Sequence, residues 1–130
     1  MLHNWENYTV LITEDDEMSY RYLEMLLTKK TNINIIWATT GIQAVEYCKI
    51  YEKIDLVLMD LQLPELDGLE ATKQIKAFKS RLPVIIQTAN SMNDEEVRCF
   101  NAGCDGYITK PINSATLIGC MEKYLTPVTV

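Results

Sequence analysis

Strand-like and helix-like segments alternate five times along this chain of 130 residues. Short apolar runs bounded by polar residues predict strands, whereas apolar residues three and four positions apart predict the helices between them. The expected strands are Tyr8–Thr13, Ile33–Ala38, Asp55–Asp60, Pro83–Gln87 and Gly106–Thr109. Because such alternation forms parallel sheets with right-handed crossovers, we predict one α/β domain with helices on both faces. For five strands the expected fold is a flavodoxin-like (βα)5 three-layer sandwich with sheet order 2-1-3-4-5.

The helices between these strands have polar starts and one apolar face each. Thr40 with Gln43 resembles a capping box, and Asn113 suits the start of the last helix. The fourth helix, Asn93–Ala102, is short and weakly apolar, and Gly103 suits its end. The residues expected to face the core are Met18, Tyr22 and Leu26, with Leu23 and Leu27 beside them, in the helix near Glu17–Lys30; Ala44, Val45, Cys48 and Tyr51 in the second; Leu69, Thr72, Ile75 and Phe78 in the third, which Asp67 and Glu70 open; and Leu117, Ile118, Met121 and Leu125 in the last.

The composition argues against several classes of protein. Twelve basic and eighteen acidic residues give a net charge of -6, which argues against a nucleic-acid surface. No run of about 18 apolar residues is present, so we expect no membrane span and no direct membrane contact. Residues 1–7 lack the basic and apolar regions of a signal peptide, which predicts a cytoplasmic domain. The four cysteines show no C-x-x-C spacing and are expected to be reduced and packed: Cys48, Cys99, Cys104 and Cys120.

Two of the predicted strands end in acidic residues. The apolar run Leu56–Met59 stops at Asp60, and the first strand is followed by Glu14, Asp15 and Asp16. In the predicted order these two strands are neighbours about 4.8 Å apart, and their carboxyl ends lie at the point where such sheets bind ligands. We therefore expect the Asp15 and Asp60 carboxylates to share one cation. Asp16 leaves the position of the acidic pair ambiguous by one residue, and the strand register favours 14 and 15.

The fourth and fifth strands end at the same edge, where Thr88 and Lys110 directly follow them. Clustered carboxylates repel each other unless a cation holds them, and hard oxygen ligands at an open pocket favour Mg²⁺. A carboxylate that attacks phosphorus needs its own charge screened and the phosphoryl oxygens neutralised. Lys110 and the Thr88 hydroxyl suit the phosphoryl oxygens, so the residues predict a phosphoryl-accepting site.

Four segments, in order and at matching spacings, resemble the receiver domains of two-component response regulators over nearly the whole chain. They are Val10–Glu17 (VLITEDDE), Asp55–Gly68 (DLVLMDLQLPELDG), Pro83–Asn90 (PVIIQTAN) and Ala102–Pro111 (AGCDGYITKP). The resemblance implies that Asp60 is the phosphoacceptor and that Mg²⁺ is the cofactor. It further implies that Asp15 binds the metal directly, that Glu14 acts through water, and that the Gln62 backbone carbonyl is another ligand.

The same resemblance assigns roles around the acceptor. Thr88 and Tyr107 match the switch pair, Lys110 matches the phosphate-contacting lysine, and the Lys110-Pro111 peptide is expected to be cis. Gln62 and Asn90 match positions that tune how fast the phosphoryl group is lost. A phosphohistidine on a histidine kinase or phosphotransfer domain would donate to Asp60, and the surface of the fourth helix, fifth strand and fifth helix would then be remodelled. Such a domain is not an enzyme in the ordinary sense, although it assists its own phosphorylation and dephosphorylation.

Three other functions have to be weighed. A flavodoxin-like electron carrier would need a glycine- and hydroxyl-rich phosphate loop after the first strand, and it is rejected because Glu14, Asp15 and Asp16 stand there and would repel a phosphate. A Mg²⁺-dependent aspartyl-phosphate phosphatase would place a second acid two residues after the nucleophile, where this chain has Gln62. A receiver-like module that binds partners without phosphorylation is the third alternative, and the complete set of acids, threonine and lysine counts against it.

The boundaries of the domain are expected as follows. Residues 1–130 form one receiver domain with a core of about 8–125, a leader of 1–7 and a tail of 126–130. His3, the single histidine, lies in the leader, so the phosphodonor is expected to be another domain or protein. No output region follows Leu125, which leaves a stand-alone regulator or a module of a larger protein. The stretch Trp5–Thr9 resembles the entry into receivers of hybrid histidine kinases, whose parent proteins can be membrane-anchored.

Overall fold

The computed structural model describes residues 3–89 and 93–125, which form five parallel strands and five helices. The predicted α/β fold and the strand order β2-β1-β3-β4-β5 are confirmed. In chain order the elements are β1 (Thr9–Thr13), α1 (Glu17–Lys30), β2 (Asn34–Ala38), α2 (Gly41–Ile50), β3 (Leu56–Asp60), α3 (Gly68–Phe78), β4 (Val84–Thr88), α4 (Asn93–Asn101), β5 (Gly106–Thr109) and α5 (Ser114–Leu125).

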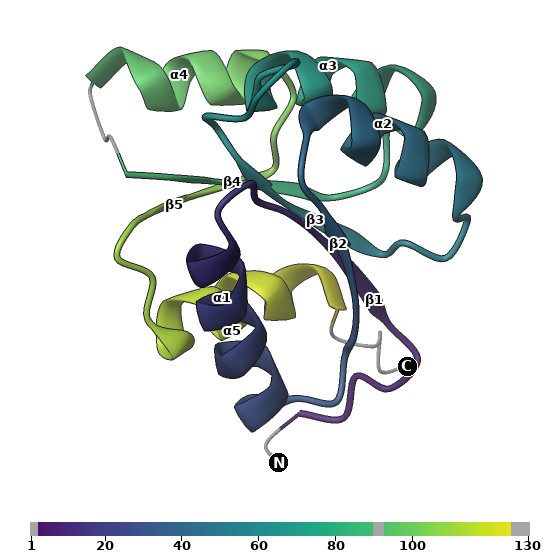
Figure 1. Cartoon of the computed structure of the whole chain (residues 1–130), viewed down its shortest axis with the longest axis vertical. Helices are drawn as coiled ribbons and strands as arrows, with labels where there is room; N and C mark the ends of the chain where they lie inside the picture. The colour runs from purple at the N-terminus through teal and green to yellow at the C-terminus, as the bar shows by residue number, and fades with distance from the viewer. Residues whose placement is uncertain (1–2, 90–92, 126–130) are drawn as a thin grey trace.

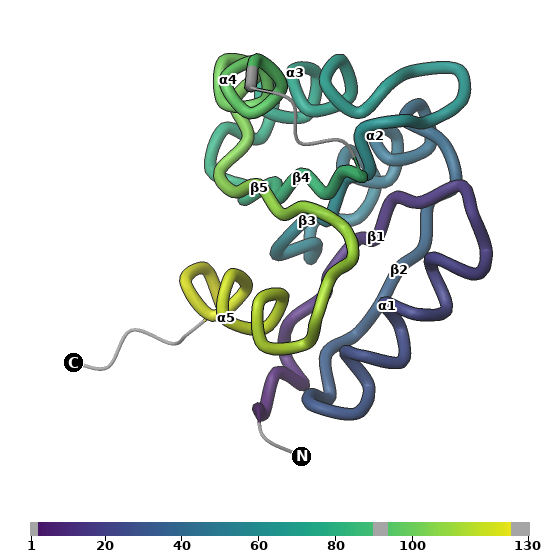
Figure 2. The backbone as a smooth tube through the Cα atoms, turned by 90° about the vertical axis from the view of Figure 1, so that its left-hand side faces the viewer, coloured from purple at the N-terminus to yellow at the C-terminus, as the bar shows by residue number. Residues whose placement is uncertain are grey.

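The helices form two layers around the sheet. α1 and α5 lie on one side, and α2, α3 and α4 lie on the other (Figure 1), an arrangement that the perpendicular view repeats (Figure 2). Alternate residues of each central strand therefore face different helices, which is why β3 and β4 are buried at all five positions. For example, Leu58 and Ile85 pack in the α1/α5 layer, whereas Val57 and Ile86 pack in the layer with α3.

The strand register aligns the carboxyl ends of the central strands. Thr13 of β1 pairs with Met59 of β3, so Glu14 and Asp60 each follow directly after this last pair. Asp60 in turn pairs with Gln87 of β4, and Thr88 pairs with Thr109 of β5. The residues that follow β1, β3, β4 and β5 consequently gather along one edge of the sheet.

The caps predicted at Thr40 and Asp67 are confirmed, but several predicted helix faces are not. Asp16, Thr40 and Asp67 accept backbone hydrogen bonds as N-caps of α1, α2 and α3. The predicted apolar face of α5 is fully buried. Four residues predicted to face the core are instead exposed: Met18, Tyr22, Tyr51 and Phe78.

These exposed positions have simple geometric causes. The buried stripe of α1 consists of Tyr20, Leu23 and Leu27, which turns Met18 and Tyr22 to its flank. Tyr51 is the C-cap beyond α2, and Phe78 is the last residue of α3, so both lie where their helices leave the sheet. Tyr51 and Phe78 were therefore wrongly predicted to be buried because each lies at the end of its helix.

The segment before β1 packs against the domain. Trp5 is buried in the α1/α5 layer, and its carbonyl accepts a hydrogen bond of 2.9 Å from the Tyr8 amide. The His3 ring contacts Glu122 of α5, and the His3 backbone amide donates to the Lys30 carbonyl at 3.0 Å. The packed core thus includes an aromatic residue from ahead of the first strand.

Cys48, Cys99 and Cys104 are buried free thiols, as expected for packed cysteines, and Cys120 is half-buried. Burial raises the pKa of Cys48 and of Cys99 to about 11, which keeps both thiols protonated at neutral pH. Among residues 3–89 and 93–125, no helix combines the length and apolar character needed to cross a bilayer.

Candidate functional site

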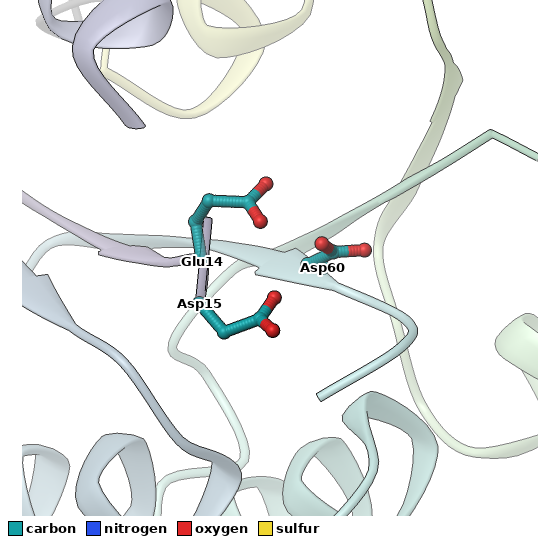
Figure 3. A group of neighbouring side chains, drawn as sticks. All are labelled: Glu14, Asp15 and Asp60. Atoms are coloured by element: carbon teal, nitrogen blue, oxygen red, sulfur yellow. The ribbon is translucent and has the colours of Figure 1, made fainter. Parts of the chain in front are cut away.

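Three carboxylates meet at the carboxyl edge of the sheet. Glu14 and Asp15 follow β1, Asp60 ends β3, and one oxygen from each lies within 4.8 Å of the other two. Figure 3 shows the Glu14 and Asp15 side chains leaving adjacent positions, one upward and one downward in this view, with both carboxylates turned toward Asp60. The structure thus brings together the two acidic strand ends that the sequence placed at one site.

Two of these carboxylates are buried and one is exposed. Glu14 is 1% exposed and Asp60 is 7% exposed, whereas Asp15 faces solvent. Backbone amides support the buried pair: the Asp16 amide donates to Glu14 Oε2 at 3.2 Å, and the Gln62 amide donates to Asp60 Oδ1 at 3.3 Å. Burial, together with the neighbouring Asp60, raises the pKa of Glu14 to about 7.

Lys110 places a positive charge beside the two buried carboxylates. Its Nζ lies 3.2 Å from Glu14 Oε1 and 3.4 Å from Asp60 Oδ2. Burial alone would lower the pKa of Lys110, but the charges of Asp60 and Glu14 outweigh it and raise the pKa. The Lys110 amide donates to the Thr88 carbonyl at 2.7 Å, and the Lys110-Pro111 peptide is cis, as expected. The lysine therefore bridges both buried carboxylates as a cation.

The loop after Asp60 folds back onto its own strand. The Gly68 amide donates to the Leu61 carbonyl at 2.9 Å, and a Cβ at position 68 would lie 2.3 Å from the Asp60 carbonyl oxygen. Only glycine fits so close to the backbone of the acceptor strand. Asp67 caps α3 through the Glu70 amide at 2.9 Å, which places it outside the acidic cluster.

Asp16 also has a structural task. Its Oδ2 accepts hydrogen bonds from the Ser19 amide at 2.9 Å and from the Ser19 hydroxyl at 2.8 Å. Asp16 is therefore the N-cap of α1, and it is not part of the carboxylate cluster in the described residues. This geometry favours Glu14 and Asp15 as the acidic pair.

An open pocket of about 820 Å³ lies above the carboxylates. Its wall includes Gln62 and Thr88, as the sequence predicts, and also Glu95 and Arg98 from α4. Sequence reasoning did not single out these two charges. Their spacing of three residues, which puts both on one side of a helix, is the only signal that could have found them.

The predicted switch residues lie on neighbouring strands. Thr88 ends β4 and is almost fully buried at the pocket, and Tyr107 of β5 pairs with Ile86 in the ladder. The Tyr107 hydroxyl donates to Glu95 Oε1 at 2.9 Å, and burial together with this carboxylate raises the pKa of Tyr107. Asn90, the second predicted tuning residue, lies outside the described residues.

An aromatic pair supports the end of β1. The Trp37 indole Nε1 donates to the Glu14 carbonyl at 2.8 Å, and its ring stacks on that of Tyr20 with centroids 4.0 Å apart. These contacts join β2 and α1 to the backbone that carries the acidic pair. Sequence reasoning missed Trp37, because it lies 23 residues after Glu14 in the sequence and no local pattern indicates that the two residues meet.

Comparison with known proteins agrees with this geometry. The family model of the response regulator receiver domain matches residues 10–122. The polar-differentiation response regulator DivK of Brucella ovis is 35% identical over 119 residues, which cover 90% of this chain and 95% of DivK.

Solved structures show the same fold. The receiver domain of the sensor histidine kinase PA1611 from Pseudomonas aeruginosa, with magnesium in its active-site cleft, has a TM-score of 0.84 and 30% identity, covering 93% of this chain and 99% of that one. The receiver domain of Ssk1 from Saccharomyces cerevisiae, solved with the phosphotransfer protein Ypd1, has a TM-score of 0.83 and 30% identity, covering 92% and 89%. The fold, the acidic edge and the family match together show that this chain belongs to the response regulator receiver domains of two-component signalling.

Proposed function

We propose that Asp60 accepts a phosphoryl group from a phosphohistidine. The observation that carries this assignment is the position of Asp60. It is the last residue of β3 and lines the open pocket, and its carboxylate lies 3.4 Å from the Lys110 ammonium. A buried carboxylate with a cation beside it and an open approach is the arrangement that a carboxylate nucleophile requires.

In this reaction an Asp60 carboxylate oxygen attacks phosphorus, and the bond from phosphorus to the donor imidazole nitrogen breaks. The imidazole leaves with the bonding electron pair, and an acyl phosphate forms on Asp60. Lys110 would neutralise negative charge on the phosphoryl oxygens, because its Nζ already contacts the attacking carboxylate. The Gln62 backbone amide donates a hydrogen bond of 3.3 Å to the other Asp60 oxygen and so orients the nucleophile.

The donor set of the acidic edge suits Mg²⁺. Oxygen atoms from Glu14, Asp15 and Asp60 lie close enough to serve one small hard cation directly or through water. We assign Asp15 and Asp60 as direct ligands, Glu14 as a ligand through water, and the Gln62 carbonyl as a further ligand. When bound, this cation would screen the repulsion between the nucleophile and the phosphoryl oxygens.

Phosphorylation would then act on the surface formed by α4, β5 and α5. Thr88 lies at the pocket and would hydrogen-bond a phosphoryl oxygen, which leaves room for the Tyr107 ring on the next strand. Turning that ring inward would break the bond from Tyr107 to Glu95 of α4. The two states thus differ in a contact that links β5 to α4.

The donor in this proposal is a histidine kinase or a phosphotransfer protein, in a cytoplasmic setting. The Ssk1 receiver, solved with the phosphotransfer protein Ypd1, supports such a partner. The PA1611 receiver, which is a domain of a sensor histidine kinase, supports placement in a hybrid kinase. Gln62 and Asn90 are proposed to tune the lifetime of the acyl phosphate.

Incubation with acetyl phosphate and Mg²⁺, followed by intact-mass measurement, tests the assignment. The wild-type protein should gain one phosphoryl group, and Asp60→Asn should gain none, because an amide is not a nucleophile toward phosphorus. Asp67→Asn, which changes a carboxylate of the same loop outside the cluster, should retain full labelling. Labelling of the Asp60→Asn variant would refute the assignment, and an unlabelled wild-type protein would favour a module that binds without phosphorylation.

A further inference from the structure

A second cavity adjoins the acidic pocket. It lies between α1 and the segment after β5, has a volume of about 270 Å³, and is mainly apolar. Leu23 and Tyr22 of α1 form one wall, and Pro111 and Ile112 form the other. Glu14 and Lys110 stand at the boundary, since both line this cavity and the acidic pocket.

The buried amide of Gln87 also lines this cavity. Gln87 is 1% exposed, and neither its Oε1 nor its Nε2 has a hydrogen-bond partner among the described residues. Its neighbour two residues earlier, Ile85, packs in the α1/α5 layer, so strand alternation directs Gln87 to the same side. A buried amide with both atoms unsatisfied is unfavourable, and a ligand that offers one donor and one acceptor would relieve it.

The charges at the cavity boundary are already paired. Lys110 Nζ lies 3.2 Å from Glu14 Oε1 and 3.4 Å from Asp60 Oδ2, so the cation faces two carboxylates. An anionic ligand would meet an excess of carboxylate, and a cationic ligand would find the exposed Asp15 in the adjoining pocket instead. A neutral ligand suits the cavity best.

The walls of the cavity are fixed by the fold. The Tyr22 hydroxyl donates to the Ile112 carbonyl at 2.6 Å, which joins α1 to the segment after β5. Met18, which is 81% exposed, lies at the cavity and leaves the mouth accessible to solvent. The volume is slightly below the range of typical small-molecule sites, which limits the ligand to about one ring.

We propose that this cavity binds a small neutral planar molecule with a carboxamide or lactam group, and that Gln87 recognises this group through paired hydrogen bonds. The ring would lie between the apolar walls, and its amide edge would meet the Gln87 amide. Nothing in phosphoacceptance by Asp60 requires such a site, so the two proposals stand independently.

Titration of the full chain with nicotinamide, followed by NMR, tests this site. The probe should shift the Gln87 side-chain NH₂ resonances and the Ile112 methyl resonances saturably in the millimolar range. The Leu69 methyl resonances, which report on the acidic pocket, should move less. 3-Methylpyridine keeps the ring but lacks the amide, and should bind about tenfold more weakly.

Gln87→Met is the matched variant, because it keeps the length of the side chain and removes both polar atoms. It should weaken nicotinamide binding about tenfold and still accept a phosphoryl group from acetyl phosphate, which shows that it is folded. The proposal is overturned if wild-type resonances do not shift saturably or shift chiefly at Leu69. It is also overturned if Gln87→Met binds nicotinamide as tightly as the wild-type protein does, or if the wild-type protein binds 3-methylpyridine as tightly as nicotinamide.

Discussion

The interior of the sheet and its carboxyl edge lie next to each other and have opposite properties. In β3, four consecutive apolar residues, Leu56–Met59, are buried between two helix layers, and the fifth residue, Asp60, is buried beside another carboxylate. Each buried apolar side chain stabilises the fold by about 1.5–3 kcal/mol. At the edge, burial and the neighbouring Asp60 disfavour the charged form of Glu14 and raise its pKa. Along β3, the last residue that stabilises the core, Met59, is directly followed by the residue of the candidate site, Asp60.

The largest expected effect lies in the interior. Leu58→Ala should lower the free energy of unfolding by about 2–5 kcal/mol, because Leu58 is almost fully buried and a cavity would remain. Val97→Ala on the exposed side of α4 is the control, and should change it by about 0.5 kcal/mol or less. Urea denaturation measures both. Similar losses for the two variants would remove the contrast between interior and surface.

The second effect is the pH dependence that the edge imposes. Glu14 has an ordinary pKa of 4.5 and a folded pKa of about 7, so the folded protein binds more protons between these values. Stability should therefore fall as pH rises from about 4.5 to about 7, by up to about 3 kcal/mol. Denaturation at several pH values with a Mg²⁺ chelator measures this loss. Glu14→Gln should flatten the curve in this window, and an unchanged slope would contradict the role of Glu14.

The third effect connects the edge to its proposed cation. Saturating Mg²⁺ at 100 times its Kd should raise the free energy of unfolding by about 2.7 kcal/mol, because only the folded protein assembles the carboxylates. Asp15→Ala should lose most of this gain. Asp16→Ser, which can still cap α1, should keep it. Equal losses in the two variants would place the acidic pair one residue further along.

The smallest effect is expected where the edge meets α4. Tyr107→Phe removes the hydrogen bond to Glu95 and should lower the free energy of unfolding by about 0.5–1.5 kcal/mol. Labelling of Asp60 by acetyl phosphate should persist, since the Tyr107 hydroxyl donates to Glu95 of α4, whereas the contacts to the Asp60 carboxylate come from Lys110 and from the Gln62 backbone amide. Loss of labelling in this variant would extend the chemical site beyond the edge.

The strand order and the acidic edge could be predicted because both follow from local patterns. A buried run such as Leu56–Met59 must lie inside a sheet, and the alternation with helices fixes the direction of its neighbours. Once β1 and β3 are adjacent, Glu14 and Asp60 must meet. The apolar face of α5 was equally predictable, because Leu117, Met121 and their neighbours follow helical spacing without exception.

The remaining features depend on contacts between distant segments. Met18 has the spacing of a core residue but is exposed, because the sheet covers only the stripe around Leu23. Glu95 and Arg98 border the pocket only because the fold brings α4 close to the residues at the ends of β3 and β4. Gln87 reads as an ordinary strand residue, and its unsatisfied amide becomes visible only when the neighbouring helices are in place.

The indole bond from Trp37 to the Glu14 carbonyl makes one aromatic ring a neighbour of the acidic edge. The other tryptophan, Trp5, is buried in the core ahead of β1, whereas Trp37 packs against the same layer only in part and hydrogen-bonds the acidic edge. Replacing Trp5 with phenylalanine would leave Trp37 as the single tryptophan, hydrogen-bonded to the backbone of the acidic pair. The protein thus carries its own optical probe of what binds at this edge, with no label added.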